Sequence, residues 1–399
     1  MPWSQTSPMN QKVLFIADHL KGARPVADLC AEYGISRKTA YKWIERYIRQ
    51  GAAGLEDRSR RPRRSPTSTP DEIVAAILQV RRQHPSWGAK KILRVLRGRH
   101  PRWRLPGRSA CCLILQRHGL IRRKTRRRVI GHPGRPSALI LGPNHVWCAD
   151  FKGQFRMGNG RYCYPLTVTD AHSRFLLGCQ GLASTAVEGA KPVFQRLFEE
   201  YGLPQFIRSD NGVPFATNTL ARLSRLSAWW VRLGVMPQLI EPSSPQQNGR
   251  HERMHRTLKA ETTRPPGAAM RSQQTKFDRF RKEFNHVRPH EALDQEVPAS
   301  AYRPSPRPMP SKLPSLEYPD RFEVRYVSAN GGIRWNSQWV NVSITCVGEY
   351  VGLEEIDDGV WNVYFGALRL GRLDERNMRI EDAYGRLFRH RWLLHMSVD

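Results

Sequence analysis

Apolar runs of strand length alternate with helical segments between residues 142 and 300, and this pattern restricts the fold more than any other feature. Three apolar runs come first, and helices and strands then alternate. In chain order the apolar runs are HVWCADF, CYPLTVTD, FLLGCQG, PQFIRSD and MPQLIE, and the long helical segments are AVEGAKPVFQRLFEEYG and ATNTLARLSRLSAWWVRLG. This order is typical of a layered α/β domain in which helices cover a sheet. We expect such a domain over residues 140–302.

Three acidic residues hold defined places in this pattern. Asp150 lies in the strand-like WCADFKG, Asp210 ends a short apolar run in IRSDNG, and Glu252 lies near a helix start in SPQQNGRHERMHRTLK. Carboxylates are hard oxygen ligands that suit Mg²⁺, which also binds substrate phosphates. A pair of such ions can activate an attacking oxygen and stabilise a leaving one in phosphodiester chemistry. These residues are therefore a candidate metal site, and isolated surface carboxylates are the alternative.

Positive charge is concentrated in the N-terminal part of the chain. The 399 residues carry 65 Lys and Arg against 35 Asp and Glu, a net charge of +30, and residues 1–140 hold 31 basic and 8 acidic residues. Such an excess attracts phosphate backbones because binding releases counterions. A merely solvated basic surface fits less well, because the same region carries an ordered helical pattern. A lipid surface is also disfavoured, because no amphipathic anchor is evident.

The first 56 residues predict a small helical DNA-binding domain. Residues 10–51 indicate three short helices, the second in PVADLCAEYG and the third in SRKTAYKWIERYIRQG, with Ser36 as N-cap of the third and Gly34 in the turn before it. The residues spaced to face a small core are Val26, Leu29, Cys30, Ile35, Ala40 and Trp43. A helix-turn-helix offers its third helix to the major groove. The outward positions would then be Arg37, Lys38, Tyr41 and Lys42. An ordinary helical bundle is the alternative.

A second helical unit is expected over residues 69–130, after a basic, proline-containing linker at residues 57–68. Thr69-Pro70-Asp71-Glu72 predicts a capping box with proline at the first helical position. The expected helices are DEIVAAILQVRRQ, SWGAKKILRVLRG and SACCLILQRHGLI. They resemble a second helix-turn-helix in layout.

The C-terminal part predicts short strands. Residues 303–320 hold six prolines and indicate a linker. Turns at Asn330-Gly331 and Asp358-Gly359 separate short strand-like runs, which predicts a small β-barrel over residues 321–375, followed by a tail at 376–399. No stretch of about 18 apolar residues predicts a membrane span. The seven cysteines form no C-x-x-C pair, so we expect reduced, buried thiols in a cytosolic protein.

The segment around Glu252 predicts a helix with a functional face. Ser244-Pro245-Gln246-Gln247 indicates a capped start near Pro245. Positions four and seven apart share a helical face, so Glu252, Arg256 and Lys259 should lie together. The carboxylate would hold metal while the two cations hold phosphate. A surface Glu–Arg pair worth only about a few tenths of a kcal/mol is the alternative.

The same helix contains HERMH at residues 251–255, which matches the zinc-protease signature H-E-x-x-H. That hypothesis requires a third protein ligand downstream and a peptide cleft. It gives no role to Asp150, to Asp210 or to the basic N-terminal part. We therefore interpret the match as a coincidence, and the roles of His251 and His255 stay open.

Taken together, WCADFKG, TDAHSRF, SDNG and SPQQNGRHERMHRTLK resemble the catalytic core of DDE insertion-sequence transposases, in the retroviral-integrase superfamily. The resemblance extends over essentially the whole chain: GLEDRSRRPRRSP resembles the linker after the first helix-turn-helix, FNHVRPHEAL the helix after the core, and RYVSANGGIRWNSQWVNVS and DDGVWNVYFGALRLG the C-terminal barrel. One departure is the 42 positions between Asp210 and Glu252, which exceed the usual spacing. The extra residues fall in SAWWVRLG.

The resemblance implies a multidomain protein with all-α helix-turn-helix N-terminal domains, an α/β RNase H-like catalytic core and an SH3-like C-terminal β-barrel. It places Asp150, Asp210 and Glu252 at the catalytic and metal-binding positions, and Asp170 at an acidic position that binds no metal. It implies cleavage of transposon ends with Mg²⁺ (or Mn²⁺), two ions in all, and attack of the exposed 3′-hydroxyl on target DNA.

The partners implied are double-stranded DNA and further copies of the chain, as a homo-oligomer (dimer or tetramer) on DNA in the bacterial cytoplasm, associated with the nucleoid. The alternative function is a catalytically inactive or domesticated transposase that acts as a DNA-binding regulator. The intact set of three acids separates the two, because a pure regulator does not need it.

Overall fold

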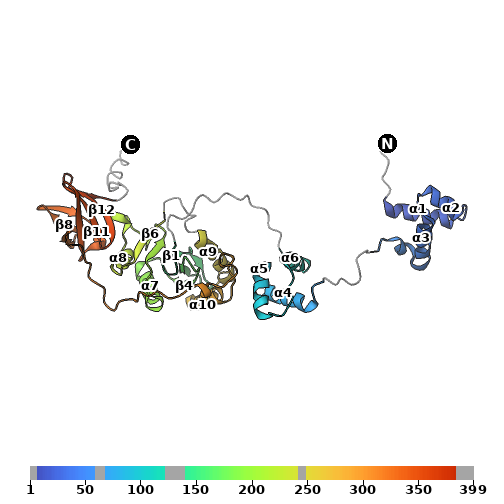
Figure 1. Cartoon of the computed structure of the whole chain (residues 1–399), viewed down its shortest axis with the longest axis horizontal. Coiled ribbons are helices and arrows are strands. Elements are labelled where there is room, and N and C mark those ends of the chain that lie inside the picture. Colours follow the sequence, from blue (N-terminus) through green and yellow to red (C-terminus); the bar gives the residue numbers. More distant parts are fainter. Residues whose placement is uncertain (1–6, 59–67, 122–139, 241–248, 383–399) are drawn as a thin grey trace. The chain divides into compact units, whose positions relative to one another are not determined.

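The computed structural model describes residues 7–58, 68–121, 140–240 and 249–382, coloured in Figure 1. The chain separates into two compact units, residues 1–68 and 69–399. The first unit holds helices α1 (Pro8–Leu20), α2 (Val26–Glu32), α3 (Arg37–Gln50) and the short η1 (Gly51–Leu55). Ser36 caps α3 as expected, since its side chain accepts a hydrogen bond from the Thr39 N–H. The expected core positions are buried or packed against this small core.

The second unit begins with helices α4 (Asp71–Gln83), α5 (Ala89–Arg99) and α6 (Arg108–Arg117), which share a core around the fully buried Trp87. The predicted capping box is wrong. Pro70 occupies the N-cap position and no side chain caps the helix. Thr69 lies one residue before the N-cap and so cannot cap the helix. The negative charges of Asp71 and Glu72 in the first turn stabilise the helix start instead.

Charged pairs join this helical module to the domain that follows it within the second unit. His84 pairs with Glu283 at 2.8 Å, and Arg94 pairs with Glu296 at 2.5 Å. Lys90 also pairs with Glu291. Most of these side chains are well exposed, so each pair contributes little to stability by itself.

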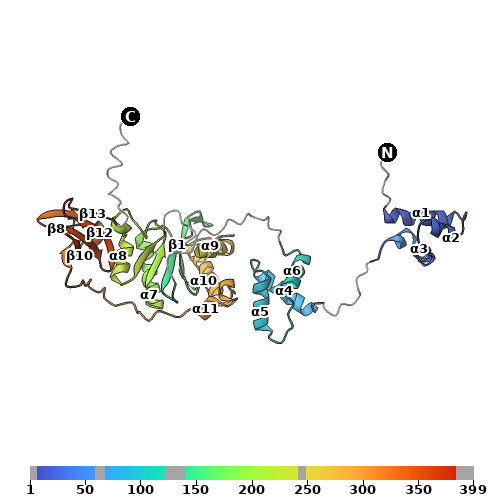
Figure 2. The same ribbon diagram turned by 45° about the horizontal axis from the view of Figure 1, so that its top comes forward.

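A mixed six-stranded sheet forms the centre of the α/β domain, as the alternation predicted (Figure 2). Its strands are β1 (Val146–Phe151), β2 (Phe155–Arg156), β3 (Tyr162–Asp170), β4 (Leu176–Leu182), β5 (Phe206–Ser209) and β6 (Met236–Leu239). The order is β2-β3-β1-β5-β6, with β4 also paired to β3. The first strands pair antiparallel, whereas β1, β5 and β6 run parallel to one another.

Helices cover both faces of this sheet, and the alternation along each strand decides which side chain meets which helix. On one face, Trp147 and Ala149 of β1 pack with α7 (Val187–Tyr201) and α8 (Arg225–Arg232). On the other face lie α9 (Gly249–Thr262) and α10 (Met270–His286), whose apolar side chains pack with Cys163 of β3. The shorter helical elements are η2 (Leu220–Arg222), η4 (Glu291–Leu293) and α11 (Pro298–Ala301).

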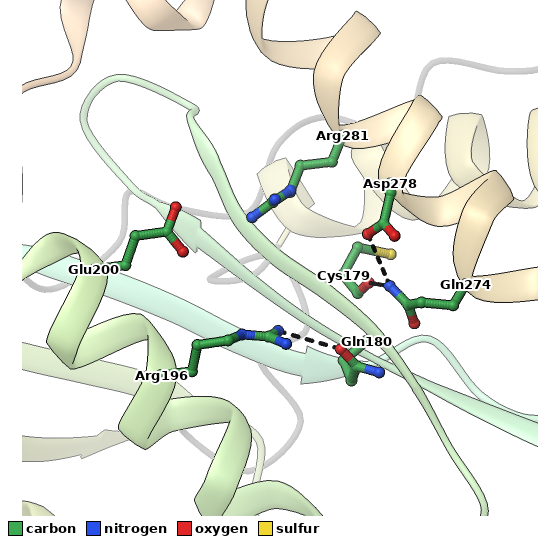
Figure 3. A pocket seen from close by; sticks show the side chains of 7 residues that line it. All are labelled: Cys179, Gln180, Arg196, Glu200, Gln274, Asp278 and Arg281. Carbon is green, nitrogen blue, oxygen red and sulfur yellow. Dashed lines mark hydrogen bonds between the residues drawn. The ribbon is translucent and has the colours of Figure 1, made fainter. Parts of the chain in front are cut away.

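Side chains of α10 close the free edge of strand β4. Asn285 bonds both the N–H and the carbonyl of Leu176, at 2.8 and 3.0 Å. Gln274 donates to the Cys179 carbonyl and accepts from the Gly181 N–H, both at 2.9 Å. Beside these contacts is a polar pocket of about 400 Å³, drawn in Figure 3 and lined by Cys179, Gln180, Arg196, Glu200, Gln274, Asp278 and Arg281. An edge strand satisfied in this way cannot recruit another strand.

The C-terminal part is built from antiparallel strands, but they do not close into the barrel that we expected. Strands β7 (Glu323–Tyr326), β10 (Tyr350–Asp357), β11 (Val360–Phe365), β12 (Leu368–Asp374) and β13 (Arg379–Glu381) form one sheet in the order β13-β12-β11-β10-β7. Strands β8 (Gly332–Trp335) and β9 (Gln338–Asn341) form a separate ribbon, and η5 (Ile344–Cys346) follows it. Closure would require hydrogen bonds from β7 or β13 to the ribbon. The two sheets instead share a core through their side chains.

Two further expectations concern cysteines and membranes. All seven cysteines are free, and six of them are buried, as predicted. No helix in the described ranges is long and apolar enough to span a bilayer.

Candidate active site and metal centre

Two of the three candidate carboxylates meet at one edge of the sheet. Asp150 lies near the end of β1, and Asp210 directly follows β5. These strands are parallel neighbours, with Cys148 opposite Arg208. Because the carboxyl ends of parallel strands lie at the same edge, the fold brings together residues that are 60 positions apart in the sequence.

Helix α9 supplies the third carboxylate. Side chains alternate along β1, so Asp150 points to the face opposite Ala149. Helix α9 covers the face to which Asp150 points. Glu252 lies in the first turn of α9. Glu252, Arg256 and Lys259 are all exposed, in agreement with a shared outer face of the helix. The expected helix start at Ser244 and Pro245 falls outside the described residues.

Electrostatic repulsion links the three acids. Burial and the negative charges of Asp210 and, more weakly, Glu252 together raise the pKa of Asp150 to about 7, against the opposing effects of Lys152 and of a hydrogen bond from the Phe151 N–H. Burial also raises the pKa of Asp210, although a hydrogen bond from the Gly212 N–H opposes the shift. The acids are therefore close enough to sense one another, in a setting that penalises their charge.

This donor set fits a divalent cation. Asp210 and Glu252 lie near enough to Asp150 for their charges to raise its pKa, although burial is the larger cause. Among the described residues, the three carboxylates do not all lie within 4.8 Å of one another. Hard oxygen ligands of this kind suit Mg²⁺ or Mn²⁺ better than softer metals.

Both histidines of HERMH point into the protein. His251 and His255 are 3% and 5% exposed, and their Nε2 atoms lie 2.7 and 2.6 Å from the hydroxyl of Thr167 on β3. His251 Nδ1 also lies 3.0 Å from the Thr169 hydroxyl. His255 Nδ1 lies 3.7 Å from an Asp150 carboxylate oxygen.

The arrangement does not support the zinc-protease alternative. Burial lowers the pKa of His251 to about 3 and that of His255 to about 2, so both rings are neutral at pH 7. Nitrogen and oxygen atoms of Asp150, His251 and His255 do lie within 4.8 Å of one another, as metal ligands could. However, zinc ligation requires free ring nitrogens, and the Nε2 atoms of both rings are engaged with Thr167.

The sequence analysis missed several residues of this site. Thr167 and Thr169 gave no signal, because threonine is a common strand residue. Lys152 was also missed, although it stands two residues after Asp150. Asp170 has a structural role: its buried carboxylate accepts hydrogen bonds from the Asn144 N–H at 2.8 Å and from the Ser173 N–H and hydroxyl at 2.7 and 2.6 Å.

On the first unit, the four residues expected to face DNA are all exposed on α3: Arg37, Lys38, Tyr41 and Lys42. The Lys42 ammonium lies 4.4 Å from the centre of the Trp43 ring, which anchors α3 in the small core.

Comparison with known proteins agrees with these features. Two models of the integrase core domain match residues 141–245 and 233–298. A helix-turn-helix domain model matches residues 11–63 and a homeodomain-like domain model matches residues 39–110. An insertion element IS136 protein of Agrobacterium fabrum, described as uncharacterized, is 26% identical over 202 residues, 48% of this chain and 95% of that protein. The chain therefore carries an integrase core domain and helix-turn-helix domains, and it is similar to a protein of a bacterial insertion element.

Retroviral polyproteins also match part of this chain. The Gag-Pol polyprotein of baboon endogenous virus (strain M7) is 31% identical over 122 residues, and the Pol polyprotein of feline endogenous virus ECE1 is also 31% identical over 122 residues. The match covers 31% of this chain in both cases, but only 7% and 11% of those polyproteins. This chain therefore corresponds to a small part of each.

Among solved structures, the magnesium-bound catalytic core domain of HTLV-2 integrase, in its trimeric form, matches with 13% identity and a TM-score of 0.33, covering 41% of this chain and 99% of that one. The integrase in a simian T-cell lymphotropic virus intasome matches with 15% identity and a TM-score of 0.36, covering 73% of this chain and 97% of that one.

Proposed function

We propose that Asp150, Asp210 and Glu252 bind two divalent ions and catalyse DNA cleavage and strand joining at the ends of an insertion sequence. The observation that supports this proposal is that Asp150 of β1 and Asp210 after β5 lie at one edge of the sheet, where the charges of Asp210 and of Glu252 on α9 add to the effect of burial in raising the pKa of Asp150. Bound Mg²⁺ or Mn²⁺ would activate the attacking oxygen and stabilise the leaving oxygen.

Two reactions follow at this site. In the first, a water oxygen forms a bond to the phosphorus at the transposon end while the bond from phosphorus to the 3′-oxygen breaks, which leaves a 3′-hydroxyl. In the second, that hydroxyl oxygen attacks a phosphorus of target DNA, and the bond from this phosphorus to the target's own 3′-oxygen breaks. The second step exchanges one phosphodiester for another, so it needs no nucleotide cofactor.

The remaining residues would bind the DNA. Arg37, Lys38, Tyr41 and Lys42 on α3 would contact the transposon ends in the major groove. Arg256 and Lys259 would hold the phosphates that flank the scissile bond, because they share the exposed face of Glu252. Synapsis of two ends and a target favours a homo-oligomer, which we propose as the active form on double-stranded DNA.

Asp150→Asn tests the catalytic assignment, and Asp278→Asn on the exposed side of α10 is its matched control. We expect the Asp150 variant to lose Mg²⁺-dependent end cleavage while it binds end DNA like the wild type, and we expect the control to keep both properties. Cleavage at the wild-type rate by Asp150→Asn would refute the assignment. A wild-type protein that binds end DNA and represses a promoter, but cleaves with neither Mg²⁺ nor Mn²⁺, would favour the regulator instead.

A further inference from the structure

The two histidines that flank Glu252 have no task in the proposed chemistry, yet they are buried in its immediate surroundings. His251 directly precedes Glu252, and His255 lies three residues after it. Their rings contact each other edge to face, with 4.5 Å between ring centres. Both rings meet at a single hydroxyl, that of the fully buried Thr167.

One arrangement of protons satisfies the four hydrogen bonds made by the Thr167 and Thr169 hydroxyls. The Thr167 hydroxyl donates its proton to the backbone carbonyl of Asp150 at 3.1 Å. Its oxygen can then accept one Nε2–H from each ring. His251 Nδ1, which carries no proton in that tautomer, accepts from the Thr169 hydroxyl. The geometry therefore assigns the Nε2–H tautomer to both rings.

These bonds connect the candidate catalytic residues across two elements. Thr167 is the register partner of Asp150 in the pairing of β1 and β3. A continuous path of hydrogen bonds thus runs from the Asp150 backbone through Thr167 to the residue that precedes Glu252. Met254 and Leu258 of α9 also pack against the sheet, through apolar side chains. Apolar contacts are non-directional and fix the rotation of a helix less sharply than hydrogen bonds do.

We propose that His251 and His255 are positioning residues, which clamp α9 to Thr167 and so hold Glu252 in place relative to Asp150 and Asp210. This inference rests on the proposed function, since it gives Glu252 its role as a metal ligand. It also gives the H-E-x-x-H spacing a role other than zinc binding: the helical spacing places two rings on the inner face of α9 and the carboxylate between them on the outer face.

Thr167→Val tests the clamp in the full-length protein, because valine keeps the β-branched shape and removes only the hydroxyl. Thr167→Ser restores the hydroxyl. Thr262→Val is the matched control, since Thr262 is also buried but its hydroxyl donates to the Leu258 carbonyl of its own helix α9. The measurements are Mn²⁺ affinity without DNA, the Mg²⁺ concentration at half-maximal end cleavage, and the unfolding temperature.

Loss of a group that orients a metal ligand typically weakens metal affinity or activity about 10–100-fold. We expect Thr167→Val to weaken Mn²⁺ affinity and to raise the required Mg²⁺ concentration by a factor in that range. Thr167→Ser should recover most of both, and Thr262→Val should change neither. Unchanged Mn²⁺ affinity in a folded Thr167→Val protein would overturn the clamp, because a merely structural threonine would lower only the unfolding temperature.

Nitrogen NMR of histidine-labelled protein gives a test that does not depend on catalysis. We expect ring signals of two neutral Nε2–H tautomers, assigned through His251→Asn and His255→Asn. An Nδ1–H tautomer at either position, or displacement of these signals by stoichiometric Zn²⁺ in the folded protein, would contradict the proposed bonds. If the wild type cleaves no DNA, the proposed function fails, while the tautomers and the Mn²⁺ affinities still decide whether the clamp exists.

Discussion

Asp150 and Thr167 face each other across the antiparallel pairing of β1 and β3, and the Thr167 hydroxyl donates to the Asp150 carbonyl at 3.1 Å. Strand register, rather than closeness in sequence, therefore places Asp150 beside Thr167, whose hydroxyl contacts both histidine rings of α9. The surroundings of Asp150 also set the pKa of its carboxyl group, and the consequences of that pKa can be measured.

Metal affinity should depend on pH through Asp150. The pKa of Asp150 is about 7 in the folded protein, so its carboxyl group is mostly protonated below that pH. A cation that binds there must displace the proton. We expect the Mg²⁺ concentration at half-maximal cleavage to fall as pH rises from 6 to about 7 and to level off above it. A flat profile across this range, with DNA binding held constant, would argue against Asp150 as a ligand.

The same shift predicts the pH dependence of the metal-free protein's stability. Between about pH 4 and 7 the folded chain keeps a proton on Asp150 that the unfolded chain releases. The contribution of Asp150 to the free energy of unfolding therefore falls as the pH rises. The difference in unfolding free energy between wild type and Asp150→Asn should change with pH in that window and be constant above it. Denaturant titrations at each pH provide the measurement.

Binding to transposon ends should depend on α3. Affinity is expected to fall by about 10³–10⁵ between about 50 and 200 mM salt if six to ten phosphates are contacted. Arg37→Ala and Lys38→Ala should each weaken end binding and, where a phosphate contact is lost, reduce the salt slope by about 1. Arg49→Ala, an exposed arginine on the same helix that pairs with Glu45, is the control. Equal losses of affinity in all three variants would mean that these residues contribute only nonspecific positive charge.

Lys259→Ala should weaken binding of pre-cleaved ends and slow strand joining, while Mn²⁺ affinity is retained. The reason is that Lys259 shares a helical face with Glu252 but carries a cation suited to phosphate rather than to metal. Arg253→Ala is the control, since Arg253 is exposed on α9 but lies about 100° around the helix from Glu252. Cross-linking of a modified terminal base would compare the variants, and identical yields would make Lys259 an ordinary surface residue.

The closed edge of β4 predicts a difference between two amide side chains. Asn285→Ala should lower the free energy of unfolding by about 1–3 kcal/mol for each Leu176 backbone group left unsatisfied. Gln274→Ala should cost less, because its partners lie beside an open pocket where water can replace the amide. Equal losses would mean that solvent does not reach the Gln274 site.

Much of the candidate site was predictable because its signals are local. The apolar run around Asp150 predicted strand β1, and helical spacing predicted a helix that carries Glu252, Arg256 and Lys259. The helix-turn-helix was also predictable, since the Ser36 cap and the core spacing of α2 and α3 lie within one short segment. The three acids were identified by residue type and place, and their catalytic role remains a proposal.

The sequence by itself determined the order of elements, the faces of each strand and helix, and the excess of positive charge, because these follow from periodicity and composition within a segment. Only the tertiary structure decided that Thr167 meets both histidines, that the pKa of Asp150 rises to about 7, and that the C-terminal strands form an open sheet and a ribbon. Each of these depends on strand register, burial or pairing between segments far apart in the chain, and no local pattern encodes which distant side chain will arrive.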